Sequence, residues 1–328
     1  MLGFSYILGA LSLASVVSST AILLPLYSWP EDNSTWSPVY KAAAAHPDIL
    51  FQVIVNPDSG PGETTYPDDS YIASVAQLNS YSNVEVIGYI PTGYGTRDIS
   101  SIKTAIATYS NWSSYKAENI TISGIFFDEA PRTNDDTLIS YMQEVSESAK
   151  SSSLPTVVFN PGTKLETGSA AEYFKAADLI VEFENSYSTW TSIVPADEIS
   201  DTYYDKAAIL LYSAPLTADY EAVVHEAQGM GLGAAYLTNG DDYKTADSLS
   251  KVAASFVQAD GDTVGSSSAG STLPSAVVST VASTAVSTVA STAVSTVTVT
   301  AVSTVTLTAI STVTVTAVPF QHANAQAK

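Results

Sequence analysis

The sequence has no cysteine and very little histidine. Without a thiol, the 328-residue chain forms no disulfide, uses no cysteine nucleophile and offers no thiolate to a metal ion. Its three histidines, His46, His225 and His322, lie far apart in sequence. This spacing argues against a histidine-rich metal site and against a Ser-His-Asp arrangement. We therefore expect a function that needs no metal and no cofactor.

Positive charge is also scarce. The chain has 12 Lys+Arg against 33 Asp+Glu, which gives a formal net charge of -21. Nucleic acids and anionic membranes bind basic surfaces, so we expect neither as a partner. The acidic balance suits a neutral or cationic partner, although it also serves ordinary solubility.

The first twenty residues are typical of a secretory signal peptide. An apolar run, Leu2–Val17, precedes the small residues Ser18–Thr20, although the usual Lys or Arg near the start is missing. Glycosylation sequons at Asn33, Asn111 and Asn119 are compatible with export. We expect a secreted, extracellular protein, associated with the cell wall or the cell surface.

The composition changes after Val257. Residues 259–328 are expected to form a Ser/Thr-rich linker and a tail in which an octad close to A-V-S-T-V-x-x-T recurs between Ala285 and Thr316. Such a tail is typical of an O-glycosylated stalk that could retain the protein at the wall, and without glycans its β-branched residues favour self-association. The polar end, Gln321–Lys328, predicts no membrane anchor.

Between these segments, short apolar runs alternate with amphipathic stretches such as Asp135–Lys150 and Ala196–Lys206. The apolar runs are Ala21–Tyr27, Leu50–Asn56, Val84–Tyr89, Ile122–Asp128, Thr156–Asn160, Leu179–Glu184, Ala208–Tyr212 and Ala234–Thr238. They lack polar alternation, as strands covered on both faces should. Eight strand–helix units in ~240 residues predict an α/β fold, a (β/α)8 TIM-like barrel over residues 21–258. A doubly wound open sheet is the competing fold, but no G-x-G-x-x-G follows the first run.

Acidic, amide and aromatic residues follow the expected strands, where the site of such a barrel lies. The fourth run ends in two adjacent carboxylates, Asp128 and Glu129, and the sixth ends in Glu184. Candidate substrate contacts at the other strand ends are Tyr27, Trp29, Asn56, Asp58, Tyr89, Tyr94, Asn160 and Tyr212. Aromatic faces stack on sugars, and amides and carboxylates bind hydroxyl groups. Trp29 and Trp190 are candidate stacking platforms, and packing beneath a loop is the alternative for either one.

Strand alternation makes a further prediction about the acids. Glu182 and Glu184 share one face of their strand, so both face the barrel axis if Val181 and Phe183 face the helices. By the same rule Asp128 and Glu129 point in opposite directions unless the strand has already ended. A carboxylate from the fourth strand and one from the sixth could then flank a glycosidic bond.

Several segments resemble the spherulin-4-like family of secreted and surface proteins. The resembling segments are Leu24–Tyr27, Val55–Gly62, Val86–Gly95, Gly124–Glu129 and Phe183–Glu184, in the family's order. The family includes family 135 glycoside hydrolases, (β/α)8 barrels that cleave α-1,4-linked N-acetylgalactosamine within galactosaminogalactan. The resemblance implies an endo-acting hydrolase for such an amino-sugar polysaccharide, with catalytic acids at Asp128, Glu129 and Glu184. The repeats lie outside the resembling part.

We hypothesise a two-carboxylate retaining mechanism, with Asp128 as nucleophile, Glu184 as acid/base and Glu129 as an auxiliary acid; the first two roles could be exchanged. Three alternatives remain open: a non-catalytic carbohydrate-binding or wall protein on the same barrel, an adhesin acting through the repeats, and a hydrolase of deacetylated polygalactosamine. An ion pair of Asp128 or Glu184 with Arg97 or Arg132 would favour the non-catalytic protein.

Overall fold

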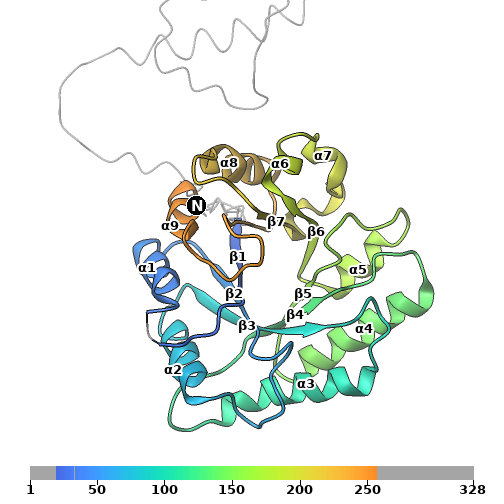
Figure 1. Cartoon of the computed structure of the whole chain (residues 1–328). Coiled ribbons are helices and arrows are strands. Elements are labelled where there is room, and N and C mark those ends of the chain that lie inside the picture. Colours follow the sequence, from blue (N-terminus) through green and yellow to red (C-terminus); the bar gives the residue numbers. More distant parts are fainter. Residues whose placement is uncertain (1–19, 33, 257–328) are drawn as a thin grey trace, which may run out of the picture. The chain divides into compact units, whose positions relative to one another are not determined.

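The computed structural model describes residues 20–32 and 34–256 of the chain (Figure 1). The signal peptide expected at 1–20 lies outside this part except for its last residue. The linker and repeat tail expected at 259–328 also lie outside the described residues. The boundaries expected for these segments therefore stay predictions.

Eight parallel strands close into one barrel in chain order, with β8 paired to β1. The strands are β1 (Ala21–Leu26), β2 (Phe51–Val55), β3 (Val84–Pro91), β4 (Gly124–Asp128), β5 (Thr156–Phe159), β6 (Leu179–Ser186), β7 (Ala207–Tyr212) and β8 (Ala234–Leu237). The predicted (β/α)8 barrel is confirmed, and the open doubly wound sheet is wrong. Because all strands run the same way, their carboxyl ends meet at one rim.

Helices surround the barrel (Figure 1). They are α1 (Ser37–Ala45), α2 (Asp69–Leu78), α3 (Ile99–Asn111), α4 (Asp136–Ser151), α5 (Ala170–Ala176), α6 (Tyr187–Trp190), α7 (Pro195–Glu198), α8 (Tyr220–Met230) and α9 (Leu249–Ser255), with 3-10 turns η1 (Trp112–Ser114) and η2 (Asp201–Lys206). In the described part of the chain, no helix is long and apolar enough to span a membrane.

The helix expected over Ala196–Lys206 is interrupted. Ile199 is extended, with φ -119° and ψ 144°, and its side chain is buried. The next residue, Ser200, donates its backbone N–H at 2.7 Å and its hydroxyl at 2.8 Å to the buried Glu182. These tertiary contacts outweigh the local helical pattern, so α7 ends and η2 begins beyond it.

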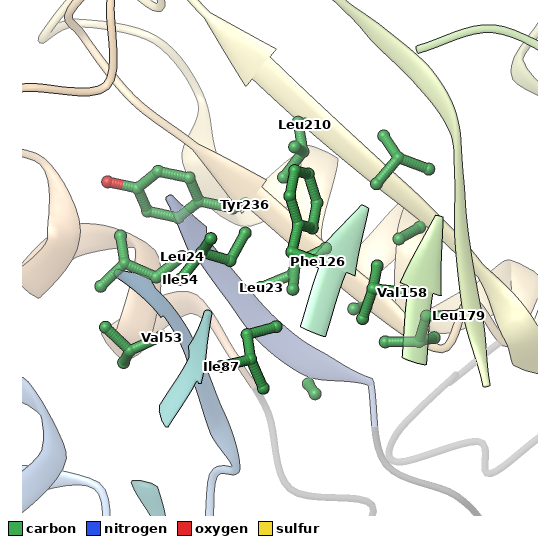
Figure 2. Packing of buried hydrophobic residues seen from close by; sticks show 14 of the residues in the cluster. Leu23, Leu24, Val53, Ile54, Ile87, Phe126, Val158, Leu179, Leu210 and Tyr236 are labelled. Carbon is green, nitrogen blue, oxygen red and sulfur yellow. The ribbon is translucent and has the colours of Figure 1, made fainter. Parts of the chain in front are cut away.

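Apolar side chains fill the barrel interior. Figure 2 shows Leu23, Ile54, Ile87, Phe126, Val158, Leu210 and Tyr236, which come from seven strands and pack together. The strand register explains their meeting: Ile54 pairs with Ile87, Phe126 with Val158 and Leu210 with Tyr236. The interior is thus a packed core, and the chemistry is left to the rim.

Aspartates start four of the helices. Asp68, Asp98, Asp135 and Asp219 each accept a backbone N–H from the first turn of α2, α3, α4 and α8, respectively. A carboxylate at this position satisfies an otherwise unpaired N–H and interacts favourably with the helix dipole. Part of the acidic surplus therefore serves helix capping rather than partner recognition.

Gly124 supplies a stability test of the β4–β5 contact. A Cβ built there would lie 2.2 Å from the backbone oxygen of Thr156 on β5. Gly124→Ala should therefore lower the free energy of unfolding by about 1–3 kcal/mol, because the two strands would have to separate. Urea unfolding measures this change.

Gly229→Ala is the matched control. Gly229 lies in α8 with nothing within 4 Å of its added Cβ. Its replacement should leave stability unchanged or raise it by ~0.4–1 kcal/mol. Equal unfolding midpoints for the two variants would contradict the assigned packing of β4 against β5.

Candidate active site

The side chain of Asn160 joins two carboxylates at the rim. Asp128 is the last residue of β4, Asn160 follows β5, and Glu184 lies in β6. The Asn160 Nδ2 donates to Asp128 Oδ1 at 2.8 Å and to Glu184 Oε2 at 2.7 Å. The distance between Asp128 Oδ1 and Glu184 Oε2 therefore cannot exceed the sum of these two hydrogen-bond lengths. This closeness of one oxygen pair is compatible with the short carboxyl separation of retaining glycosidases, ~5–5.5 Å.

Backbone pairing beyond the strands holds this group together. The Asn160 N–H donates to the Phe127 carbonyl at 2.9 Å, and the Asn160 carbonyl accepts from Ala130 N–H at 2.9 Å. Glu184 in turn donates its N–H to the Gly162 carbonyl at 2.9 Å. The loops after β4 and β5 are therefore held in register with each other and with β6, which gives the side chains fixed positions.

A β-bulge separates Glu184 from Glu182. The register of β6 against β7 shifts between Val181 and Phe183. The fully buried Glu182 accepts hydrogen bonds from the backbone N–H of Leu165 at 3.2 Å and of Ser200 at 2.7 Å, so it holds two loops. The condition under which both glutamates would face the barrel axis is not met, because the bulge adds a residue between Val181 and Phe183 and breaks the alternation.

Glu129 has an unusual backbone conformation. Strand β4 ends at Asp128, and Glu129 has φ 50°, so strand alternation does not extend to it. Its carbonyl accepts from Thr92 Oγ1 at 2.6 Å and from Tyr94 N–H at 2.7 Å. A left-handed conformation is unfavourable for a glutamate and persists only where such contacts hold it.

Other strained residues lie in the same set of loops. The non-glycine residues with positive φ are Ser59, Tyr94, Glu129, Ser153, Ser213 and Tyr243 among the described residues. All except Ser153 follow the carboxyl end of a strand. Strain of this kind concentrates at functional sites, so its distribution supports the rim as the functional face.

The two carboxyl groups have different surroundings. Burial raises the pKa of Glu184 above 4.5, and the charge of Asp128 adds to this rise, whereas the hydrogen bond from Asn160 opposes it. Asp128 accepts at both of its oxygens, since Tyr89 donates its hydroxyl to Oδ2 at 2.7 Å. Glu184 thus retains its proton more readily, as a general acid requires, and both Asp128 oxygens are held by donors.

Three tyrosines surround the carboxylates. The ring of Tyr27 lies edge-on to those of Tyr89, at 5.6 Å, and Tyr243, at 6.1 Å. Burial and then the charges of Asp128 and Glu184 raise the pKa of Tyr27, and burial and Glu184 raise the pKa of Tyr243. Tyr243 was not predicted from the sequence. It lies in the loop after β8, several residues beyond the expected end of that strand, and its position relative to the strand does not set it apart from the other loop residues.

The other predicted contacts lie around the same rim. Asn56 Oδ1 accepts from Gly60 N–H at 3.0 Å and so shapes the β2 loop, where Asp58 is exposed. Tyr212 ends β7 and donates its hydroxyl to Asn185 Oδ1 at 3.5 Å. Neither these contacts nor the predicted catalytic roles are tested by the geometry alone, so they stay predictions.

The two tryptophans predicted as platforms differ in exposure. Trp29 is 46% exposed, with its ring edge-on to Tyr71 at 5.2 Å, and Tyr94 in the β3 loop is 62% exposed. Trp190 is only 1% exposed, packs edge-on against Phe183 at 5.0 Å and donates its Nε1–H to Glu226. The prediction of Trp190 as a platform is therefore wrong, because it belongs to the core beneath α6.

Neither arginine considered above pairs with the carboxylates. Arg97 donates to the Pro91 carbonyl at 3.0 Å, and Arg132 lies 4.0 Å from Glu166. Within the described ranges, no ion pair involves Asp128 or Glu184. The same ranges contain no cluster of three metal-ligating side chains. The carboxylates thus remain available to a substrate.

Comparisons with known proteins agree with this arrangement. Residues 21–259 match the model of the spherulation-specific family 4. Spherulin-4 of Physarum polycephalum is 30% identical over 227 residues, which cover 67% of this chain and 63% of that protein. The crystal structure of Aspergillus clavatus Sph3 in complex with GalNAc superimposes with a TM-score of 0.67 at 28% identity, covering 73% of this chain and 98% of Sph3.

Glu184→Gln should stabilise the protein in a pH-dependent way. Because the folded-state pKa of Glu184 is raised, its contribution to stability is complete below about pH 4.5 and is lost as pH rises through the folded-state value. The neutral glutamine avoids this loss. The melting temperature of the variant should therefore exceed that of the parent by a few degrees at pH 7 and match it at pH 4. A difference that is the same at both pH values would contradict a buried, titrating Glu184.

Proposed function

The chain belongs to the spherulation-specific family 4, and from this premise we propose that it is a secreted glycoside hydrolase of an amino-sugar polysaccharide. The family match and the similarity to Sph3 support a Sph3-like glycoside hydrolase or carbohydrate-binding barrel. The finer proposal is endo-hydrolysis of α-1,4-linked N-acetylgalactosamine in galactosaminogalactan. The GalNAc in the Sph3 complex supports this substrate. The matched region spans 63% of the Physarum relative, so the activity of the whole chain is itself a proposal.

The observation that carries the proposal is the pair of carboxylates bonded to one amide. Asp128 and Glu184 are close enough for a retaining displacement and differ in their surroundings. In this mechanism Glu184 protonates the glycosidic oxygen while Asp128 attacks the anomeric carbon, giving a covalent glycosyl–enzyme. Glu184 then removes a proton from water, which attacks the same carbon and releases Asp128.

Glu129 and Tyr89 complete the proposed chemistry. Tyr89 donates to Asp128 Oδ2 at 2.7 Å and so orients the nucleophile. The charges of Asp128 and Glu129 add to burial in raising the pKa of Tyr89, so its hydroxyl keeps its proton and stays a donor. Glu129 thereby places a further negative charge near the site, where a developing oxocarbenium ion would be stabilised.

Exposed apolar side chains around the rim support a polymeric substrate. Large exposed hydrophobic residues in the described chain are Trp29, Leu50, Tyr94, Val194 and Leu216. All but Leu50 lie in loops that follow strands β1, β3, β6 and β7. A long chain that crosses the rim could contact several of these positions at once, which suits endo-action on a polysaccharide.

A non-catalytic carbohydrate-binding or wall protein is the second candidate. The exposed rings of Trp29 and Tyr94 would serve binding without hydrolysis equally well. A glycosylated repeat tail that retains the protein at the wall would also fit this function. We propose secretion and wall association under either candidate, and hydrolysis separates the two.

Hydrolysis is tested by release of reducing ends from purified galactosaminogalactan. The parent chain should release them, whereas Asp128→Asn and Glu184→Gln should each lower kcat at least ~100-fold. Glu144→Gln is the matched control, because Glu144 is an exposed partner of Lys103 at 2.6 Å and lies on α4. Its rate should equal that of the parent.

Unchanged release in the Asp128 and Glu184 variants would show that other residues carry the reaction. Polymer binding without release by any variant or by the parent would favour the carbohydrate-binding protein. Retention of configuration at the anomeric carbon, followed by proton NMR during the reaction, distinguishes the retaining from the inverting mechanism.

Polymer binding should depend on the exposed rings. Trp29→Ala and Tyr94→Ala should each raise KM roughly 3–10-fold with kcat little changed, since an aromatic contact contributes about 0.5–1.5 kcal/mol. Leu50→Ala is the control, because Leu50 is 40% exposed but precedes β2 at the opposite end of the barrel. An equal KM for the parent and the Trp29, Tyr94 and Leu50 variants would exclude the two rings from substrate binding.

A further inference from the structure

The amide of Asn160 has a determined orientation. Both hydrogens of its Nδ2 are used, one by Asp128 Oδ1 and one by Glu184 Oε2. The opposite orientation would bring the amide oxygen against two carboxylate oxygens, which would repel it. Asn160 is 6% exposed, and its Oδ1 has no hydrogen-bond partner within the described residues. The two bonds to carboxylates therefore decide how this buried side chain lies.

This orientation restricts where a proton can reside. An amide nitrogen only donates, so the oxygens that it contacts, Asp128 Oδ1 and Glu184 Oε2, both act as acceptors. Asp128 Oδ2 accepts from Tyr89. Glu184 also hydrogen-bonds the Tyr243 hydroxyl, so Glu184 Oε1, which the amide does not contact, is the oxygen at which a proton disturbs the Asn160 bonds least.

The loop of Gly162 closes the amide side of Glu184. A Cβ at Gly162 would lie 3.8 Å from both Glu184 Oε2 and Asn160 Oδ1, and the Gly162 carbonyl accepts from Glu184 N–H. Gly162 has φ 67°, a conformation that glycine adopts without strain. The Gly162 backbone thus packs beside Oε2, the Glu184 oxygen that the amide also contacts.

We propose that Asn160 is a positioning residue that assigns the roles of the two carboxyl groups: it holds Asp128 in place as nucleophile and leaves the transferable proton on Glu184 Oε1. The proposal rests on the hydrolase function above and adds the proton's location and its cause. Asn160 was predicted from sequence only as a substrate contact, whereas its described contacts are with the two carboxylates.

The direct test is the titration of Glu184 in the full chain. Infrared difference spectra over a pH series report carboxyl protonation, and subtraction of the Glu184→Gln spectra assigns the band. In Asn160→Ala the pKa of Glu184 should rise, because the ionised form loses its donor. In the isosteric Asn160→Asp it should rise as well, because a like charge replaces the donor. Circular dichroism and thermal unfolding establish that each variant folds.

Activity gives a second readout. Asn160→Ala should lower kcat about 100-fold, the order of loss expected for misplaced reacting groups, with KM little changed. Its residual activity should extend to higher pH, because the general acid keeps its proton longer. Asn83→Ala is the matched control: its amide donates to the carbonyls of Ala43, His46 and Ile49 away from the rim. This control should lose stability while the Glu184 titration and the pH profile stay unchanged.

The two proposals fail in different ways. A Glu184 midpoint that does not move in either folded Asn160 variant overturns the positioning role, even if the protein is an active hydrolase. Shifted midpoints in a protein that releases no sugar would support Asn160 as the residue that tunes the pair and would reject the hydrolase function instead. A shift of the same size in Asn83→Ala would also overturn the proposal, since the effect would then be general.

Discussion

The candidate site depends on one side-chain amide that hydrogen-bonds two carboxylates. Two carboxylates placed side by side without a donor would repel each other, and one would lose its charge. Asn160 supplies a donor to each, at 2.8 Å to Asp128 and 2.7 Å to Glu184. The barrel makes this possible, because β4, β5 and β6 are adjacent: Asp128 ends β4, Asn160 follows β5 and Glu184 lies in β6.

Acidic residues serve several purposes in this molecule, and net charge does not distinguish them. Asp68 and the three other capping aspartates start helices α2, α3, α4 and α8. Glu182 is instead buried and holds two loops by accepting hydrogen bonds from their backbone N–H groups. Glu184, two residues from Glu182, instead joins the proposed catalytic pair. Its raised pKa comes from burial first and from the neighbouring Asp128 second, so environment rather than residue type assigns its chemistry.

Much of the fold could be predicted because its signals are local. Eight apolar runs with few polar interruptions were recognisable as strands covered on both faces, and the closed barrel confirms that reading. The interrupted helix near Ile199 and the bulge near Glu182 were not predictable. In both cases the deciding contact, between Ser200 and Glu182, joins segments whose proximity depends on the completed barrel.

The barrel, the position of Asp128, Glu129 and Glu184 near strand ends, and the family resemblance could all be predicted from the sequence alone. The tertiary structure alone decided that Asn160 lies between Asp128 and Glu184, that Trp190 is core and that Tyr243 reaches Glu184 from the β8 loop. The physical reason is the range of each signal. Strand and helix patterns repeat over a few residues, whereas hydrogen bonds between strand ends depend on register and loop conformation across segments distant in the chain.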